Sequence, residues 1–248
     1  MLVGLVGVLR LLITYPLMLA VSLICGSMCL LLSLLPASIR YDLRLYHLTT
    51  SWWSWLVFKA GFISVTVQYE GEMLPTCPSD PSIIVANHTS ALDIPLIEML
   101  MGSYPRLWLS KDIYRKTPVL GWLLHRMHVM VNVDSPRDAA RSLAKIRNMA
   151  RDKARHVLMF PEGARFVDGE IHDFFAGFAV LADKLERPVR PVFIKNAGKV
   201  LAKEGFLINT THPISLIVGP PFVRAAGEDT DHFVARVRAW FCQHNRAQ

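Results

Sequence analysis

The chain has 248 residues, a formal net charge of +7 and a hydrophobic content of 52%. A chain of this length fits one membrane segment and one domain with a substantial core. The positive charge suits nucleic acid or an anionic membrane surface. The sequence carries no nucleic-acid-binding motif and its apolar excess lies at the N-terminus, so we expect membrane lipids and no nucleic acid as partners. The four cysteines show neither C-x-x-C spacing nor a disulfide framework, which indicates a reduced domain that faces the cytosol.

Residues 1–35 form an apolar segment whose only charge is Arg10. A helix over residues 11–35 would be about 37 Å long, enough to cross a hydrocarbon core of roughly 30 Å. Pro16 and Gly26 are sites where such a helix can kink, so a segment that spans the membrane and one that re-enters it are both open. A signal peptide is disfavoured, because the apolar region is too long and no small-x-small cleavage site precedes a mature domain.

Residues 39–61 combine basic residues with tryptophans: Arg40, Arg44, Lys59, Trp52, Trp53 and Trp55. Tryptophan favours the membrane interface and basic flanks favour the cytoplasmic side. We therefore expect a second helix that lies along the membrane or dips into it; a buried aromatic core helix is the alternative. Residues 1–60 are predicted to anchor the chain. Residues 61–248 are predicted to form an α/β domain on the cytoplasmic face of the membrane, the inner membrane in a bacterium.

A buried strand over residues 82–86 runs into His88, and from Ser90 onward apolar residues recur at helical spacing. His88 and Asp93 then lie on either side of a strand-to-helix turn. A carboxylate that binds one imidazole nitrogen fixes the tautomer and leaves the other nitrogen to accept a proton from a hydroxyl. This spacing predicts a general base, His88, oriented by Asp93. The S-x-x-D spacing from Ser90 also fits a capping box, in which Asp93 would only satisfy the backbone of the helix start.

A second strand, over residues 156–160, is followed directly by the sequence PEGAR at residues 161–165. Proline fixes a turn and glycine lets a ligand approach the backbone. The carboxylate of Glu162 and the guanidinium of Arg165 remain at the strand end, and arginine can grip a phosphate through two parallel hydrogen bonds. Taken alone, the pentapeptide equally fits a surface ion pair at a turn.

Together these segments resemble the lysophosphatidic acid (1-acylglycerol-3-phosphate) acyltransferases, a family of glycerolipid acyltransferases. Residues 87–93, NHTSALD, match the family's N-H-x-S-x-x-D motif, and residues 160–165, FPEGAR, match its F-P-E-G-[T/S]-R motif with one change. A block over residues 111–134 resembles the family's second motif, in which a lysine at the position of Lys111 helps to bind the acceptor phosphate. The resemblance covers residues 65–223.

The chain departs from the family pattern at three positions. Ala164 replaces the usual hydroxyl residue, Ser135 stands where the family often has an arginine, and Ala176 stands where a basic residue commonly precedes a glycine. These departures leave the acceptor open between lysophosphatidate and another lysolipid, such as a lysophospholipid or a lyso-ornithine lipid.

The resemblance implies transfer of a fatty acyl chain from an acyl thioester, carried by coenzyme A or by acyl carrier protein, to the free hydroxyl of 1-acylglycerol-3-phosphate. The product would be phosphatidic acid. The resemblance implies that His88 is the general base and that Asp93 orients it. Glu162 and Gly163 would position the glycerol. Lys111 and Arg165 would hold the phosphate.

No cofactor and no metal site is expected, since His125 and His128 lack a nearby third ligand. A serine hydrolase is disfavoured because the chain has no G-x-S-x-G elbow. A membrane-anchored lipid-binding protein without catalytic activity is the remaining alternative from another class.

The other predicted elements alternate along the chain. Strands are expected over residues 61–69, 106–109, 189–194 and 214–218, helices over residues 135–155, from 174 onward and over 233–241, and a proline-rich loop over residues 73–81. Alternating strands and helices indicate an α/β domain with a mixed, mostly parallel sheet flanked by helices. Sites in such sheets gather at strand ends, where both motifs lie.

Overall fold

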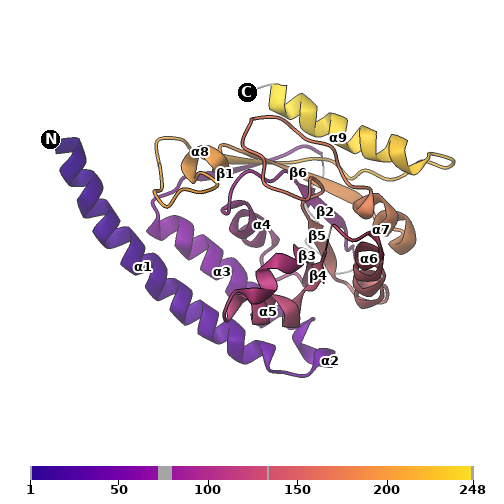
Figure 1. The fold of residues 1–248 in the computed structure, drawn as a ribbon, viewed down its shortest axis with the longest axis horizontal. Coiled ribbons are helices and arrows are strands. Elements are labelled where there is room, and N and C mark those ends of the chain that lie inside the picture. The colour runs from indigo at the N-terminus through magenta and orange to yellow at the C-terminus, as the bar shows by residue number, and fades with distance from the viewer. Residues whose placement is uncertain (1, 72–79, 133, 247–248) are drawn as a thin grey trace.

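The computed structural model describes residues 2–71, 80–132 and 134–246, and Figure 1 shows a sheet between layers of helices. Most of the loop predicted over residues 73–81 lies outside the described residues. The sheet has the strand order β1-β7-β6-β2-β5-β3-β4. Its strands are β1 (Val65–Tyr69), β2 (Ile83–Ala86), β3 (Arg106–Lys111), β4 (Val129–Val131), β5 (His156–Met159), β6 (Val189–Lys195) and β7 (Ile214–Val218).

Every described strand pair is parallel except β6 with β7, so β1 and β7 run opposite to the rest of the sheet. The predicted mixed, mostly parallel sheet is therefore confirmed. Strand β2 lies at its centre and is apolar throughout, as expected for a strand that is buried on both faces.

Alternate residues of β2 serve two cores. Ile83 and Val85 belong to the core formed with α6 (Pro136–Ala150), α7 (Gly177–Leu185) and α9 (Thr230–Arg246). Ile84 and Ala86 belong to the core on the other face, formed with α3 (Arg44–Ala60), α4 (Asp93–Met101) and α8 (Ala197–Val200). This period of two fixes the register of β2 and hence the position of the residues that follow it.

The N-terminal helices lie outside the sheet on the α4 side (Figure 1). Helix α1 (Leu2–Ser33) is followed by α2 (Ala37–Arg40) and α3, and the stretch Leu12–Ser33 is long and apolar enough to cross a membrane. Trp53 of α3 donates a hydrogen bond to the Ser22 hydroxyl of α1 (2.9 Å), while Trp52 and Trp55 are exposed. One face of α3 is thus protein core and the other presents tryptophan. Its position along a membrane stays a prediction.

Several predicted boundaries were wrong for identifiable reasons. Helix α6 ends at Ala150 instead of near residue 155, because the Arg187 guanidinium donates to the Ala150 carbonyl, the acceptor that the N–H of residue 154 would use in a longer helix. Helix α7 begins at Gly177 instead of residue 174, and the residues before it belong to the loop that the Phe175 N–H ties to the Pro161 carbonyl (2.9 Å). Strand β1 begins at Val65 rather than at residue 61, and η1 (Asp112–Lys116), α5 (Leu120–Met127), β4 and α8 were not predicted.

Candidate active site

The C-terminal ends of β2, β5 and β3 meet at one edge of the sheet, because these neighbouring strands are parallel. Strand β2 ends at Ala86, just before His88, and β5 ends at Met159, just before the motif at residues 160–165. Strand β3 ends at Lys111. The fold therefore brings the three predicted motifs to the same edge, where ligand sites of parallel sheets form.

His88 and Asp93 contact each other as the spacing predicts. The Nδ1 atom of His88 lies 2.8 Å from Oδ2 of the buried Asp93, at the N-terminus of α4. The same oxygen accepts hydrogen bonds from the backbone N–H groups of Thr89 (2.7 Å) and Ser90 (2.8 Å). The Ser90 N–H bond is one half of the predicted capping box, but the other half is not formed. Helix α4 begins at Asp93 itself, and the Ser90 hydroxyl accepts the Leu92 N–H (3.2 Å) instead of the Asp93 N–H. Asp93 therefore binds both the turn before α4 and the His88 imidazole. A proton on Nδ1 leaves Nε2 of His88 as an acceptor.

An aromatic stack covers one face of the His88 imidazole. The ring of Phe160 lies 3.9 Å from it, centroid to centroid, at an interplanar angle of 7°. Trp108 of β3 stacks in turn on Phe160 at 5.4 Å. The His88 side chain is only 13% exposed, so its ring is confined between the Asp93 bond and this stack. Phe160 is the first residue of the predicted F-P-E-G motif, but no role was predicted for it, and its position directly after a buried strand was the available signal.

Asn87 fixes the end of β2 to the neighbouring strand. Its side-chain amide donates to the Ile194 carbonyl (3.0 Å) and its amide oxygen accepts from the Ile194 N–H (2.7 Å), so it continues the β2–β6 ladder by one residue. This role was missed. A buried polar residue directly after an apolar strand requires partners for its donors and acceptors, which is the signal that would have found it.

Glu162 joins the two motif-bearing turns. Its carboxylate accepts hydrogen bonds from the backbone N–H groups of His88 (2.9 Å) and His172 (3.2 Å). Burial raises the pKa of Glu162, and the two backbone bonds oppose that shift. Both oxygens are thus engaged by the protein, and the carboxylate clamps the backbone of His88. Its predicted contact with glycerol stays a prediction.

Gly163 and Arg165 complete the turn after β5. Gly163 has φ of +67°, and the next turn is tied back by a hydrogen bond from the Phe166 N–H to the His88 carbonyl (3.1 Å). Arg165 is half-buried, and its guanidinium makes no hydrogen bond or ion pair within the part of the chain that the structure describes. A guanidinium without a partner among the described residues can bind an anionic group of a ligand.

Lys111 lies at the end of β3, which pairs with β5. No hydrogen bond or ion pair of its side chain occurs among the described residues, and none joins it to His88 or Arg165. The structure therefore places Lys111 on the same edge of the sheet as His88, and its predicted contact with a phosphate stays a prediction.

Two departures from the family pattern have local structural roles. The hydroxyl of Ser135 accepts the backbone N–H of Asp138 (3.3 Å) and caps α6. Ala176 precedes the first residue of α7, and its carbonyl accepts the N–H of Val180 (3.0 Å). Neither position supplies a cation, so Lys111 and Arg165 are the cations of the predicted phosphate site.

Replacing Gly163 with alanine is expected to lower stability by about 1 kcal/mol, because a β-carbon disfavours positive φ. The new β-carbon would also lie 2.6 Å from the Phe175 ring and so push the turn that carries Glu162. The initial rate should therefore fall even at temperatures where thermal unfolding shows the variant to be folded, and both are measured on the same preparations. Gly169→Ala is the matched control, since Gly169 has φ of +85° and an added β-carbon there would meet no atom within 4 Å. Equal loss of activity in both variants would contradict the role of the Gly163 turn.

Two other features do not contribute to this site. His128 is buried, and its Nδ1 accepts the backbone N–H of Trp108 (3.4 Å), whereas His125 is exposed. Within the described ranges, no group of three or more His, Cys, Asp or Glu side chains is arranged to hold a metal.

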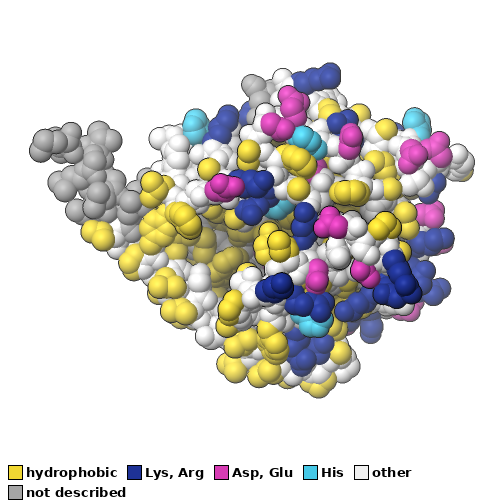
Figure 2. Space-filling view, viewed as in Figure 1, with side chains coloured by type: hydrophobic (Ala, Val, Ile, Leu, Met, Phe, Trp, Pro, Cys, Tyr) yellow, Lys and Arg dark blue, Asp and Glu magenta, His cyan; other side chains and the backbone are white. Residues whose placement is uncertain are grey.

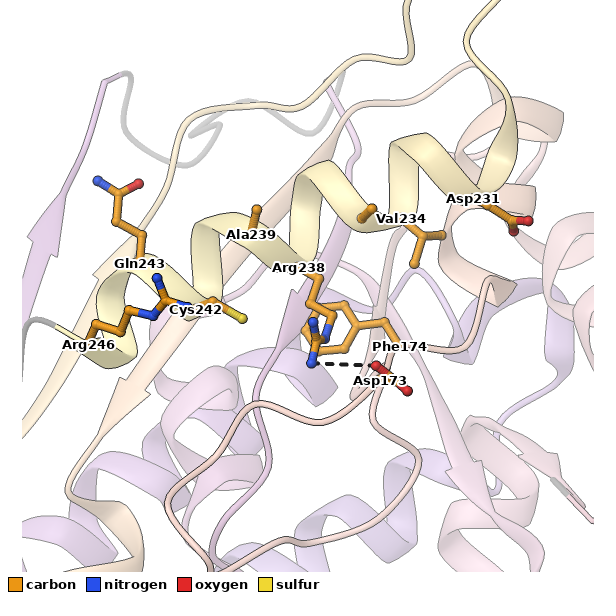
Figure 3. A pocket seen from close by; sticks show the side chains of 10 residues that line it. Asp173, Phe174, Asp231, Val234, Arg238, Ala239, Cys242, Gln243 and Arg246 are labelled. Atoms are coloured by element: carbon orange, nitrogen blue, oxygen red, sulfur yellow. Dashed lines mark ion pairs between the residues drawn. The ribbon is translucent and has the colours of Figure 1, made fainter.

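A pocket of about 630 Å³ lies beside α9. Figure 3 shows Arg238 and Asp173 at this pocket, joined by an ion pair of 3.5 Å. Its lining contains none of the predicted site residues. The chemistry of the side chains, rather than the size of this pocket, places the candidate active site at the His88 edge.

Comparisons with known proteins support the fold and the family resemblance. Residues 66–195 match the family model described as Acyltransferase. Among curated proteins, the chain is 28% identical over 165 residues to a 1-acyl-sn-glycerol-3-phosphate acyltransferase of Pseudomonas aeruginosa, covering 65% of this chain and 62% of that protein. It is 31% identical over 147 residues to the lyso-ornithine lipid O-acyltransferase of the same organism, covering 58% of this chain and 52% of that protein. The chain thus spans less than two thirds of the length of the curated relatives it matches.

A solved structure is similar over nearly the whole chain. The crystal structure of the 1-acyl-sn-glycerophosphate (LPA) acyltransferase PlsC from Thermotoga maritima matches with a TM-score of 0.74 and 24% sequence identity. The match covers 98% of this chain and 96% of that chain. At this level of identity the similarity shows the fold.

Proposed function

The chain belongs to the Acyltransferase family, and from this premise we propose that it transfers a fatty acyl chain from an acyl thioester to the free hydroxyl of 1-acylglycerol-3-phosphate, making phosphatidic acid. The observation that carries the proposal is the bond of 2.8 Å between His88 Nδ1 and Asp93 Oδ2, at a sheet edge that also bears Lys111 and Arg165. A base next to cations suits an acceptor that has both a hydroxyl and a phosphate. The name of the Pseudomonas aeruginosa relative supports the same reaction.

In the proposed mechanism, Nε2 of His88 accepts the proton of the acceptor hydroxyl as its oxygen attacks the thioester carbonyl. The carboxylate of Asp93 holds the Nδ1 proton and stabilises the imidazolium that forms. When the tetrahedral intermediate collapses, the carbon–sulfur bond breaks and the imidazolium returns its proton to the leaving thiolate. The products are an ester and a free thiol, and the reaction requires no metal and no cofactor besides the acyl thioester.

Lys111 and Arg165 would hold the acceptor phosphate, and Gly163 would let the glycerol approach the turn. The lack of protein partners for both cations among the described residues supports this assignment. Acyl-CoA and acyl carrier protein both remain candidates for the donor, because the thioester is common to them.

We further propose that the domain lies on the cytoplasmic face of a membrane. The acceptor and the product have long apolar chains, so an anchored domain avoids moving them through water.

The N-terminal segment contacts the domain at two points, Tyr15 and Leu34. The Tyr15 hydroxyl donates to the Phe206 carbonyl, and the Arg126 guanidinium donates to the Leu34 carbonyl. These points are about 28 Å apart along the chain at helical rise. An upright α1 would carry polar loops into the hydrocarbon, so a segment that re-enters the membrane is favoured over one that spans it.

The second candidate function is acylation of a different lysolipid, such as a lyso-ornithine lipid. The similarity to the lyso-ornithine lipid O-acyltransferase and the absence of cations at Ser135 and Ala176 favour it.

A panel of acceptors separates these candidates. Purified protein in detergent should convert lysophosphatidate to phosphatidic acid with acyl-CoA or with acyl carrier protein as donor. Turnover of a lyso-ornithine lipid or another lysophospholipid, without turnover of lysophosphatidate, would establish the second candidate instead. Lipid binding without any turnover, unchanged by His88→Ala, would indicate a non-catalytic lipid-binding protein.

A further inference from the structure

The segment from Asp112 to Met127, formed by η1 and α5, exposes an unusual set of large apolar side chains. They are Ile113 (74% exposed), Val119 (65%), Leu120 (49%), Trp122 (43%) and Tyr114 (37%). Exposed apolar residues scattered singly need no explanation, but a cluster on one short segment marks an interaction surface. We call this cluster the η1–α5 surface.

The backbone of the segment holds this surface outward. Gly121 of α5 packs so closely on η1 that an added β-carbon would lie 2.4 Å from the Arg115 carbonyl oxygen and 2.5 Å from that of Tyr114. Val119 adopts φ of +60°, which a β-branched residue rarely does, and its side chain is largely exposed. Strained positions persist only where the surrounding structure fixes them, and they concentrate at functional surfaces.

The η1–α5 surface continues the apolar surface of α1. Arg126 donates hydrogen bonds to the carbonyls of Ser33 (2.5 Å) and Leu34 (3.2 Å) at the end of α1, and Met127 shares a buried cluster with Cys29. Figure 2 shows hydrophobic side chains along α1 and again over the α5 region, with Lys and Arg side chains next to the latter. The two apolar areas are therefore parts of one side of the molecule.

The charges of the segment match an anionic bilayer. Lys111 precedes it, and Arg115, Lys116 and Arg126 lie within it. Its one carboxylate, Asp112, is paired with Arg115 (2.8 Å). The Arg126 guanidinium lies 5.6 Å from the Trp122 ring centroid. Tryptophan together with basic residues is typical of the boundary between headgroups and acyl chains.

We infer that the η1–α5 surface is a second membrane-contacting surface, which inserts its apolar side chains into the headgroup–acyl boundary of an anionic bilayer. A soluble acidic partner would also satisfy the charges, but it would not account for the continuity with α1. Lys111 directly precedes η1, so the insertion would place the His88 edge of the sheet against the bilayer. This last step rests on the proposed function; the membrane contact itself does not.

Trp122 provides a direct test with the full chain reconstituted in vesicles that contain anionic phospholipid. Brominated acyl chains quench only tryptophans that lie in the bilayer, and Trp122→Phe is expected to lower the quenched fraction of the intrinsic fluorescence. Trp240→Phe is the matched control, because Trp240 is 9% exposed and donates to Glu70 within the protein (3.1 Å); its removal should raise the quenched fraction. An unchanged or higher quenched fraction in Trp122→Phe would overturn the inference.

The charge requirement is tested by the double variant Arg115→Gln, Lys116→Gln. The Trp122 contribution is the difference in quenched fraction between a protein with Trp122 and the same protein with Trp122→Phe. The double variant should reduce this difference several-fold in vesicles with anionic lipid. The control pair Arg147→Gln, Arg151→Gln removes the same charge at and beyond the end of α6 and should leave that contribution unchanged. Equal effects of both pairs would show a response to net charge alone and would contradict a specific contact. Quenching requires no turnover, so this result is independent of the acceptor panel.

Discussion

The variant His88→Ala is expected to lower kcat by about 10²- to 10⁴-fold, the contribution typical of a general base. The expected loss is large because Nε2 of His88 accepts the hydroxyl proton in the proposed mechanism, and the nearby Glu162 carboxylate is already engaged by two backbone N–H groups. The fold should survive, since the ring contacts Asp93 and Phe160 at the edge of the sheet and is partly exposed. The measurement is the single-turnover rate of product formation, with circular dichroism of the same sample.

Two further variants separate catalysis from structure. Asp93→Asn should also lower kcat, and because Asp93 accepts the N–H groups of Thr89 and Ser90 it should lower the unfolding temperature as well. His244→Ala removes an imidazole–carboxylate pair of similar length, from His244 Nε2 on α9 to Glu70 Oε1 just after β1 (3.0 Å). Its rate should match wild type. A His88→Ala protein that keeps its rate within a few-fold of wild type would exclude His88 as the base.

The contact between His88 and Asp93 was predictable because it is local. Five positions separate the two residues, and a strand-to-helix turn limits how far apart their side chains can lie. The central strands were also predictable, since β2 and β5 are short apolar runs between polar residues. The mixed sheet followed from the alternation of strands and helices along the chain.

Long-range hydrogen bonds were not predictable from the sequence. Glu162 binds the backbone of His88 from 74 positions away, and Asn87 binds Ile194 from 107 positions away. Backbone donors carry no sequence signal, so a single sequence cannot reveal which carboxylate or amide they meet. Strand β4 was missed because it has only three residues, and α5 because its exposed apolar residues hide the helical period.

A buried ion pair that the sequence also concealed supports the helix that carries Asp93. Glu98 of α4 accepts hydrogen bonds from the Arg106 guanidinium of β3 and from the Trp108 indole N–H. Arg106 donates also to the Thr50 hydroxyl of α3 (2.8 Å). Its remaining donors reach the Gly102, Tyr104 and His47 carbonyls, so the cation is satisfied although it is 1% exposed. The pair therefore joins α3, α4 and β3 behind the site.

Breaking this pair with Glu98→Gln is expected to lower the free energy of unfolding by about 3–5 kcal/mol, because it leaves the Arg106 charge buried without its counterion. The measurement is urea unfolding in detergent at neutral pH. The exposed pair of Arg141 and Asp138 (3.3 Å) is the matched control, and Arg141→Gln should cost at most about 1 kcal/mol. If both substitutions cost the same, the Glu98 pair does not stabilise the fold as the structure implies.

The acid dependence of unfolding gives a second, independent readout of the same pair. Burial alone would raise the pKa of Glu98, but the charge and hydrogen bonds of Arg106 outweigh it and hold that pKa at about 2. The unfolded carboxyl has a pKa of about 4.3. Since the folded value is the lower one, the stabilisation is fully present above about pH 4.3 and is lost as the pH falls toward 2. Glu98→Gln should therefore make the free energy of unfolding less dependent on pH over this range. The double variant Glu98→Gln, Arg106→Met should show the same weaker dependence. It should also recover part of the stability lost at neutral pH, because it removes the unpaired charge of Arg106.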